Sequence, residues 1–204
     1  MATLITDPEL EERIRAQRAE WGGDRFDEVW EGTYMMTPLP NSEHAEIQMA
    51  LGTVFRLALG FSHPAKVYPG VNVSDRADDW TQNYRCPDVA VVLPDGIARD
   101  CGAYHLGGPD FVVEIVSPQD RSREKFAFYA KVGVRELLIV DRDPWGLELH
   151  RLHDGELELA GQSRLEQPDV FQSSVLPLTF RLMPGVVRPG IEVRHTDGVQ
   201  KWVV

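Results

Sequence analysis

Three segments of the chain carry apolar residues at helical spacing, and each is bounded by residues that cap or end helices. They lie at about 8–21, 42–59 and 120–132. The second has the widest apolar stripe, starts at Asn41 or Ser42 and stops at Gly60. We therefore expect three helices, of which the second and third bury one face in a core.

Other segments show short apolar runs or alternation, which are typical of strands. Strand-like segments lie on either side of Glu31-Gly32 and of Asp154-Gly155. They predict two hairpins, at 26–36 and 147–160. Further strands are expected at 66–73, 89–93, 111–116 and 136–141, with a polar loop at 74–85 and a loop or broken helix at 97–109. Beyond Pro168 the strand-like pieces 175–183, 191–194 and 199–204 are interrupted by prolines, and we interpret them as an edge or a dimer-forming extension.

The order through the middle of the chain is helix, three strands, helix, strand. This order predicts an α/β layered domain with a mixed sheet. A chain of 204 residues is long enough for one sizeable core and too short for two comfortable domains. We expect one domain over 1–204, with its core at about 26–152 and a C-terminal β extension at 153–204.

Composition excludes some classes of protein. No run approaches the roughly 20 apolar residues that cross a bilayer, and the acidic N-terminus differs from a signal peptide, so we expect a cytoplasmic protein without a membrane partner. Cys86 and Cys101 lack metal-ligand spacing and are interpreted as reduced thiols. A net charge of -11 argues against a large nonspecific nucleic-acid surface, although basic residues gather locally between Arg121 and Arg135.

Two acids accompany the apolar strands. Glu114 lies inside the run 111–116, and Asp88 follows Pro87 at the start of 89–93. Burying an unpaired ion costs several kcal/mol, whereas hard divalent cations bind carboxylate oxygens. Two acids on two buried strands therefore predict a metal site. The structural alternatives are an ion pair of Glu114 with Arg85 or Arg123, and a simple strand-entry role for Asp88.

Five segments, in their order along the chain, carry a family resemblance. They are Glu28–Gly32, Met36–Pro38 followed by His44, Pro87–Val92, Glu114–Pro118, and Lys125 with Tyr129 before Gly133–Glu136. Over roughly residues 20–150 the chain thus resembles the Uma-type restriction endonuclease family of the PD-(D/E)xK nuclease superfamily. The resemblance implies a restriction-endonuclease-like core, in which helices flank a mixed central sheet, with an N-terminal helix and hairpin and a C-terminal β extension.

The resemblance also implies a function, which is Mg²⁺-dependent endonucleolytic hydrolysis of phosphodiester bonds in nucleic acid, with DNA expected. Asp88 and Glu114 would hold the ion, with the Ile115 carbonyl as a third ligand, and Mn²⁺ could substitute. Such an ion polarises the phosphate and acidifies an attacking water. Cutting both strands would favour a two-fold homodimer.

The superfamily normally has a lysine two residues after the glutamate, where this chain has Val116. The family resemblance makes Lys125, in the following helix, the matching cation that would offset developing charge. Glu28 and His44 are secondary candidates, as a further acid at the metal site and as a group that takes a proton or contacts phosphate. The alternatives are a solvated Lys125, a helix-start His44, and a core Tyr129 with its hydroxyl at the rim.

Two other functions remain open at this point. Val116 in the usual lysine position and the overall acidity are compatible with a catalytically inactive nuclease-fold module that acts as a binding or regulatory scaffold. The acidity would also suit hydrolysis of a small phosphate ester better than that of a long polyanion.

Overall fold

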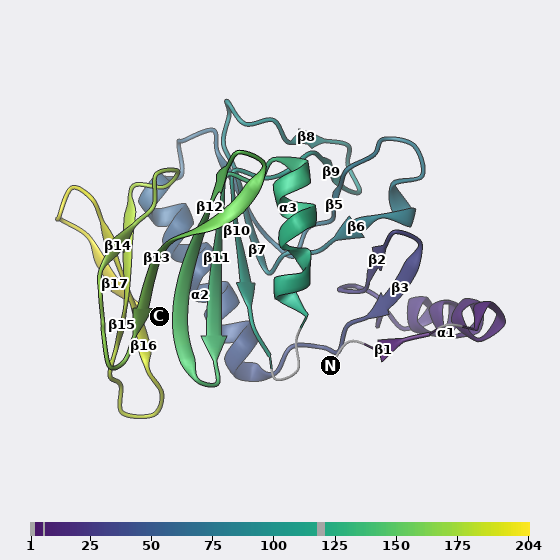
Figure 1. Cartoon of the computed structure of the whole chain (residues 1–204), viewed down its shortest axis with the longest axis horizontal. Helices are drawn as coiled ribbons and strands as arrows, with labels where there is room; N and C mark the ends of the chain where they lie inside the picture. The colour runs from purple at the N-terminus through teal and green to yellow at the C-terminus, as the bar shows by residue number, and fades with distance from the viewer. Residues whose placement is uncertain (1–2, 6, 118–120) are drawn as a thin grey trace.

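A six-stranded mixed sheet forms the centre of the computed structural model, which describes residues 3–5, 7–117 and 121–204 (Figure 1). Its strand order is β13-β12-β11-β10-β7-β4. Strands β10 and β11 pair in parallel, and the other neighbours are antiparallel. The bounds are β4 (Lys66–Pro69), β7 (Val89–Val92), β10 (Phe111–Ile115), β11 (Glu136–Arg142), β12 (Trp145–His153) and β13 (Glu156–Arg164). The predicted mixed central sheet is confirmed.

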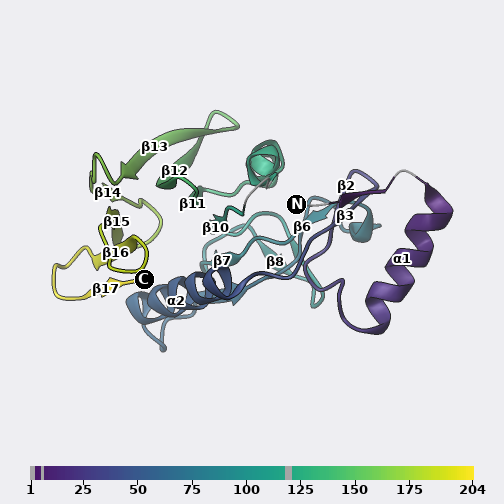
Figure 2. The same cartoon turned by 90° about the horizontal axis from the view of Figure 1, so that it is seen from below.

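Two helices cover the opposite faces of this sheet (Figure 2). Helix α2 (Ser42–Leu59) is capped by the Asn41 side chain, which accepts a hydrogen bond from the His44 amide, and it ends at Gly60 as expected. Helix α3 (Phe126–Val132) follows the short 3₁₀ helix η2 (Ser122–Lys125). The start predicted near Asp120 lies outside the described residues.

Alternation along β10 explains why both faces are covered. Phe111, Val113 and Ile115 pack in the cluster that contains the apolar stripe of α2, whereas Val112 packs in the cluster that contains Tyr129 of α3. Successive side chains of a strand point to opposite faces, so a strand buried on both sides reads as an unbroken apolar run. By the same alternation Glu114 faces α3.

A second sheet lies beside the first at the N-terminal end of the molecule and consists of short strands in the order β1-β3-β2-β6-β5-β9-β8. Helix α1 (Pro8–Glu20) buries no residue and is tied to this region by an ion pair between Arg18 and Asp27, at 2.6 Å. The strands, with one 3₁₀ helix, are β1 (Thr3–Leu4), β2 (Glu28–Trp30), β3 (Thr33–Met36), β5 (Val73–Ser74), η1 (Trp80–Gln82), β6 (Tyr84–Arg85), β8 (Arg99–Asp100) and β9 (His105–Leu106).

Three sequence predictions in this region were wrong or incomplete. The segment 97–109 contains β8 and β9 instead of a broken helix, and 74–85 contains η1 and β6 rather than only a loop. The strand predicted at 66–73 is divided at Gly70, which has a φ of +63° that favours glycine. Strands of two residues, such as β6, β8 and β9, are too short to show an alternating pattern in the sequence.

The C-terminal segment folds into a third sheet, β14-β15-β16-β17, with bounds Phe171–Gln172, Leu178–Met183, Gly190–His195 and Lys201–Val203. Its apolar face shares one buried cluster with α2, where Phe55 contacts the rings of Phe111 and Phe180 edge-on. This sheet therefore closes the core over α2, while a role in dimer formation stays a prediction. Among the described helices, none is long and apolar enough to cross a membrane.

Candidate active site

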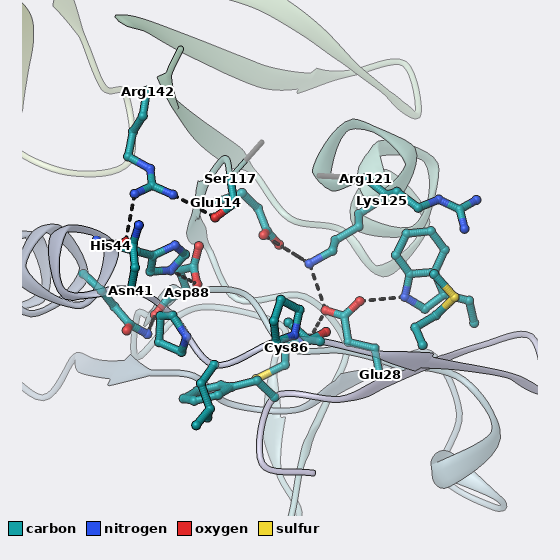
Figure 3. Close-up of a pocket in the computed structure, with 18 residues that line it drawn as sticks. Glu28, Asn41, His44, Cys86, Asp88, Glu114, Ser117, Arg121, Lys125 and Arg142 are labelled. Carbon is teal, nitrogen blue, oxygen red and sulfur yellow. Dashed lines mark hydrogen bonds and ion pairs between the residues drawn. The ribbon is translucent and has the colours of Figure 1, made fainter. Parts of the chain in front are cut away.

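A cavity of about 260 Å³ opens where β7 begins and β10 ends (Figure 3). Val89 pairs with Val113 as the last antiparallel partners of these strands, and one further residue along this register places Asp88 opposite Glu114. Residues directly opposite in an antiparallel pair project to the same face. Both acids line the cavity, as do Glu28, His44 and Lys125. Five predicted side chains, from widely separated segments, thus meet at one place.

Asp88 is held by groups from both neighbouring elements. Its Oδ1 lies 2.8 Å from Nε2 of His44, and its Oδ2 accepts a 2.6 Å hydrogen bond from the Ile115 amide. The Gln48 side chain donates to the Asp88 carbonyl at 2.7 Å. Asp88 therefore has a fixed orientation at the end of the sheet.

Glu114 is almost fully buried and accepts hydrogen bonds from Lys125, Tyr129 and, at 3.5 Å, the Ser122 hydroxyl. Lys125 Nζ lies 3.0 and 3.1 Å from its two carboxylate oxygens, and the Tyr129 hydroxyl donates to Oε1 at 2.5 Å. Burial, with the negative charges of Asp88 and Glu28, raises the pKa of Glu114 to about 8 despite the opposing effect of Lys125. The ion pair with Arg85 or Arg123 that we weighed for Glu114 is wrong, because Arg123 pairs with Asp141 and Glu148 and Arg85 hydrogen-bonds to other groups.

Lys125 links the central sheet to the N-terminal hairpin. Its ammonium also lies 2.8 Å from Oε1 of Glu28 on β2, and Glu28 in turn accepts hydrogen bonds from the Cys86 amide and the Trp30 indole. The two carboxylates outweigh the desolvation of the ammonium and raise the pKa of Lys125 above its ordinary value. A solvated Lys125 is thereby excluded: this residue is a buried, fixed positive charge.

His44 contacts Asp88 from the first turn of α2. Its Nδ1 is buried and has no hydrogen-bond partner within the described structure. A proton on Nδ1 would have no acceptor, and so the favoured neutral tautomer carries its proton on Nε2 and donates it to Asp88. This arrangement makes His44 an orienting group for Asp88.

Sequence reasoning missed two participants. Tyr129 was expected to keep its hydroxyl at the rim, but the whole side chain is buried and the hydroxyl reaches Glu114. Arg142 at the end of β11 lines the cavity and binds the Val116 carbonyl, the Ser117 hydroxyl and the Asn41 side chain. The sequence did contain a sign of Arg142, because this basic residue ends the predicted strand that follows the Glu114 strand. Val116, in the usual lysine position, packs against the cluster beneath α3.

The donor chemistry of the cavity fits a hard divalent cation. Within the described residues no three His, Cys, Asp or Glu side chains form a ready-made metal cluster. Magnesium, however, keeps several waters and needs only one or two carboxylates. Asp88 and Glu114 could supply these. In a strand the carbonyl and amide of one residue point to the same side, so the Ile115 carbonyl would face the side on which the Ile115 amide binds Asp88, although Ile115 is not among the residues that line the cavity. The cavity lining holds three acids, Glu28, Asp88 and Glu114, and Lys125 pairs with two of them. Negative charge therefore remains that a bound cation could neutralise.

Comparison with known proteins places the chain in a family. A family model described as Uma2, "Putative restriction endonuclease", matches residues 17–184. Among solved structures, the chain is similar to a "putative nuclease belonging to DUF820" from Anabaena variabilis, with 19% identity and a TM-score of 0.56 over 72% of this chain and 80% of that one. A search of curated proteins finds no match. Since the family model spans most of the chain, this protein belongs to the Uma2 family and has its restriction-endonuclease-like fold.

Proposed function

We propose that this protein is a Mg²⁺-dependent endonuclease that hydrolyses phosphodiester bonds of nucleic acid, with DNA as the expected substrate. One observation carries the proposal: Asp88, Glu114 and Lys125 come from three separate elements and line one cavity of a protein with a restriction-endonuclease-like fold. Nothing in the packing of the core requires a buried acid, a half-buried acid and a buried lysine at this point. Perturbed ionisable groups gathered in a cavity are typical of a catalytic site.

Asp88, Glu114 and the Ile115 carbonyl would hold the ion, which could equally be Mn²⁺. When bound, the ion supplies Lewis-acid polarisation of the scissile phosphate. The protein contributes orientation, because each carboxylate is fixed by neighbours before any ligand enters: Asp88 by His44 and Glu114 by Tyr129. Preorganised groups of this kind lose little energy to rearrangement during the reaction.

Lys125 would act as a permanent positive charge. Its raised pKa keeps the ammonium protonated, so it does not serve as a base. An ammonium 2.8 to 3.1 Å from Glu28 and Glu114 is close enough to the metal-binding acids to stabilise negative charge that develops on a phosphate held beside them. Lys125 would thus replace the lysine that the superfamily normally has at the position of Val116.

Calorimetric titration with Mn²⁺ and Mg²⁺ tests the metal site directly. We expect saturable binding by the natural protein and strongly weakened binding by Asp88→Ala and Glu114→Ala. Single- and double-stranded DNA and RNA are then incubated with and without metal. Cleavage that requires metal and disappears in Glu114→Gln and Lys125→Ala supports the proposal, whereas unchanged metal binding in both alanine variants contradicts it.

The second candidate is a nuclease-fold scaffold without turnover. One observation favours it: every carboxylate oxygen of Asp88 and Glu114 already has a protein partner. A scaffold would keep these contacts permanently, so its stability would not respond to Mn²⁺. A nuclease would exchange part of them for the ion, and metal would then raise its unfolding temperature.

A further inference from the structure

The cavity lining has two chemically different parts. One part is apolar and comes from the N-terminal hairpin and the segment after it, with Phe26, Met35, Pro38, Leu39 and Pro40. The other part is polar and basic and comes from the ends of β10 and β11 and from η2, with Ser117, Arg121 and Arg142 (Figure 3). Leu39 lines this cavity and is 69% exposed. A lining of this kind suits a ligand with one flat apolar part and one anionic part.

The positive charges of the cavity are already paired with acids. Arg121 lies 2.5 Å from Glu124, and Arg142 lies 3.1 Å from Glu43. Lys125 is bound to Glu28 and Glu114, as described above. With a net charge of -11 for the chain, these cations do not form the surplus of positive charge that holds the phosphates of a long duplex. Binding of a long nucleic acid through many contacts to its phosphate backbone is therefore disfavoured.

The acids also lie too deep for an intact duplex. The side chains of Glu28 and Glu114 are each 4% exposed and that of Asp88 is 19% exposed, in the lining of a cavity of about 260 Å³. A paired nucleotide in a rigid duplex cannot enter a space of this size, and enzymes whose chemistry lies inside a pocket act on single strands or extrude the nucleotide. Aromatic and apolar surfaces beside such a pocket hold an unpaired base by stacking.

We infer that this site takes an unpaired nucleotide, within a single strand or a locally opened segment, with its base against the apolar lining and its phosphate toward Asp88 and Glu114. The inference rests on the proposed nuclease function and specifies its substrate class. It excludes an uninterrupted duplex as the form that is cut.

Four substrates separate the outcomes: one single-stranded oligodeoxynucleotide, the same strand in a blunt duplex, that duplex with an unpaired internal bubble, and a mononucleotide p-nitrophenyl ester. Each is incubated with the protein and Mn²⁺. We expect cleavage of the single strand and of the bubble. The duplex should be cut at least about tenfold more slowly, because extruding a paired base costs a few kcal/mol.

Binding provides a readout besides cleavage. Affinity for the single strand is measured at several salt concentrations, and neutralising only one or two phosphates gives a shallow logarithmic slope, about -0.7 to -1.4. Leu39→Ala should weaken this binding severalfold. Leu159→Ala, which truncates another exposed leucine (53%) that does not line the cavity, should leave binding unchanged.

The outcomes that overturn the inference differ from those that overturn the function. A duplex cut as fast as the single strand, or a salt slope steeper than about -3, refutes the unpaired nucleotide and leaves the nuclease. Hydrolysis of the mononucleotide ester together with no cleavage of any strand shows that no strand is the substrate. Absence of both cleavage and binding with every nucleic acid refutes the proposed function, and the inference with it.

Discussion

The Tyr129→Phe substitution removes one oxygen atom from the buried contact beneath Glu114. The Tyr129 hydroxyl donates a 2.5 Å hydrogen bond to a carboxylate that also binds Lys125. Above about pH 8, where Glu114 is ionised, a hydrogen bond to its charged carboxylate contributes roughly 1.5–3 kcal/mol. Because Lys125 remains in place and Glu114 keeps a partner, we expect the lower end, about 1.5–2 kcal/mol of lost unfolding free energy. For a chain of this length that corresponds to about 3–8 °C in melting temperature.

The same substitution should also act on the site. The Tyr129 hydrogen bond lowers the pKa of Glu114, in opposition to burial. Its loss raises that pKa further, so the affinity for Mn²⁺ should fall at neutral pH and recover at higher pH. Stability is measured by urea and thermal unfolding, and metal affinity by calorimetry across pH.

Tyr34→Phe is the matched control. Tyr34 is also buried, and its hydroxyl donates to Asp27, which does not line the cavity. Removing it should cost comparable stability without changing the affinity for Mn²⁺. The reasoning is refuted if both variants weaken metal binding equally, or if Tyr129→Phe changes the unfolding free energy by less than about 0.5 kcal/mol.

Four other predictions follow from the same structure. Saturating Mg²⁺ should raise the melting temperature, with about 2.7 kcal/mol of stabilisation at one hundred times its dissociation constant, and differential scanning calorimetry of Asp88→Ala should show no such increase. The raised pKa of Glu114 means that the folded protein binds the proton more tightly than the unfolded chain, so stability should fall as the pH rises from about 4.5 to 8; urea titrations of Glu114→Gln should lack this decline. Lys125→Met leaves two buried carboxylates without their cation, and we expect a loss of about 3–5 kcal/mol that lessens at low pH; a constant loss across pH would contradict the ion-pair assignment. Phe180→Ala should cost about 3–5 kcal/mol if the C-terminal sheet is part of the core, whereas the fully exposed Val186→Ala should be neutral within about 0.5 kcal/mol in the same denaturation assay.

Much of the fold could be read from local pattern. The second helix, from its Asn41 cap to Gly60, and the two-sided apolar runs around Val89 and Glu114 carry their signals within a few residues. These signals suffice because capping and alternation are local rules. By contrast, the pairing of β9 with β5, some thirty residues earlier in the chain, cannot be read from a local window. The C-terminal strands likewise gave no sign that they share a buried core with α2.

For the candidate site, the sequence alone determined the acids Asp88 and Glu114, because a carboxylate in or beside a buried strand needs a reason that the nearby pattern does not provide. Only the tertiary structure decided what surrounds them: that Lys125 reaches both Glu114 and Glu28, that the Tyr129 hydroxyl turns inward, and that His44 orients Asp88. The physical reason is that spacing fixes the face from which a side chain leaves its own helix or strand. The groups that this side chain meets, and hence its charge and its role, depend on how the sheets and helices pack against each other.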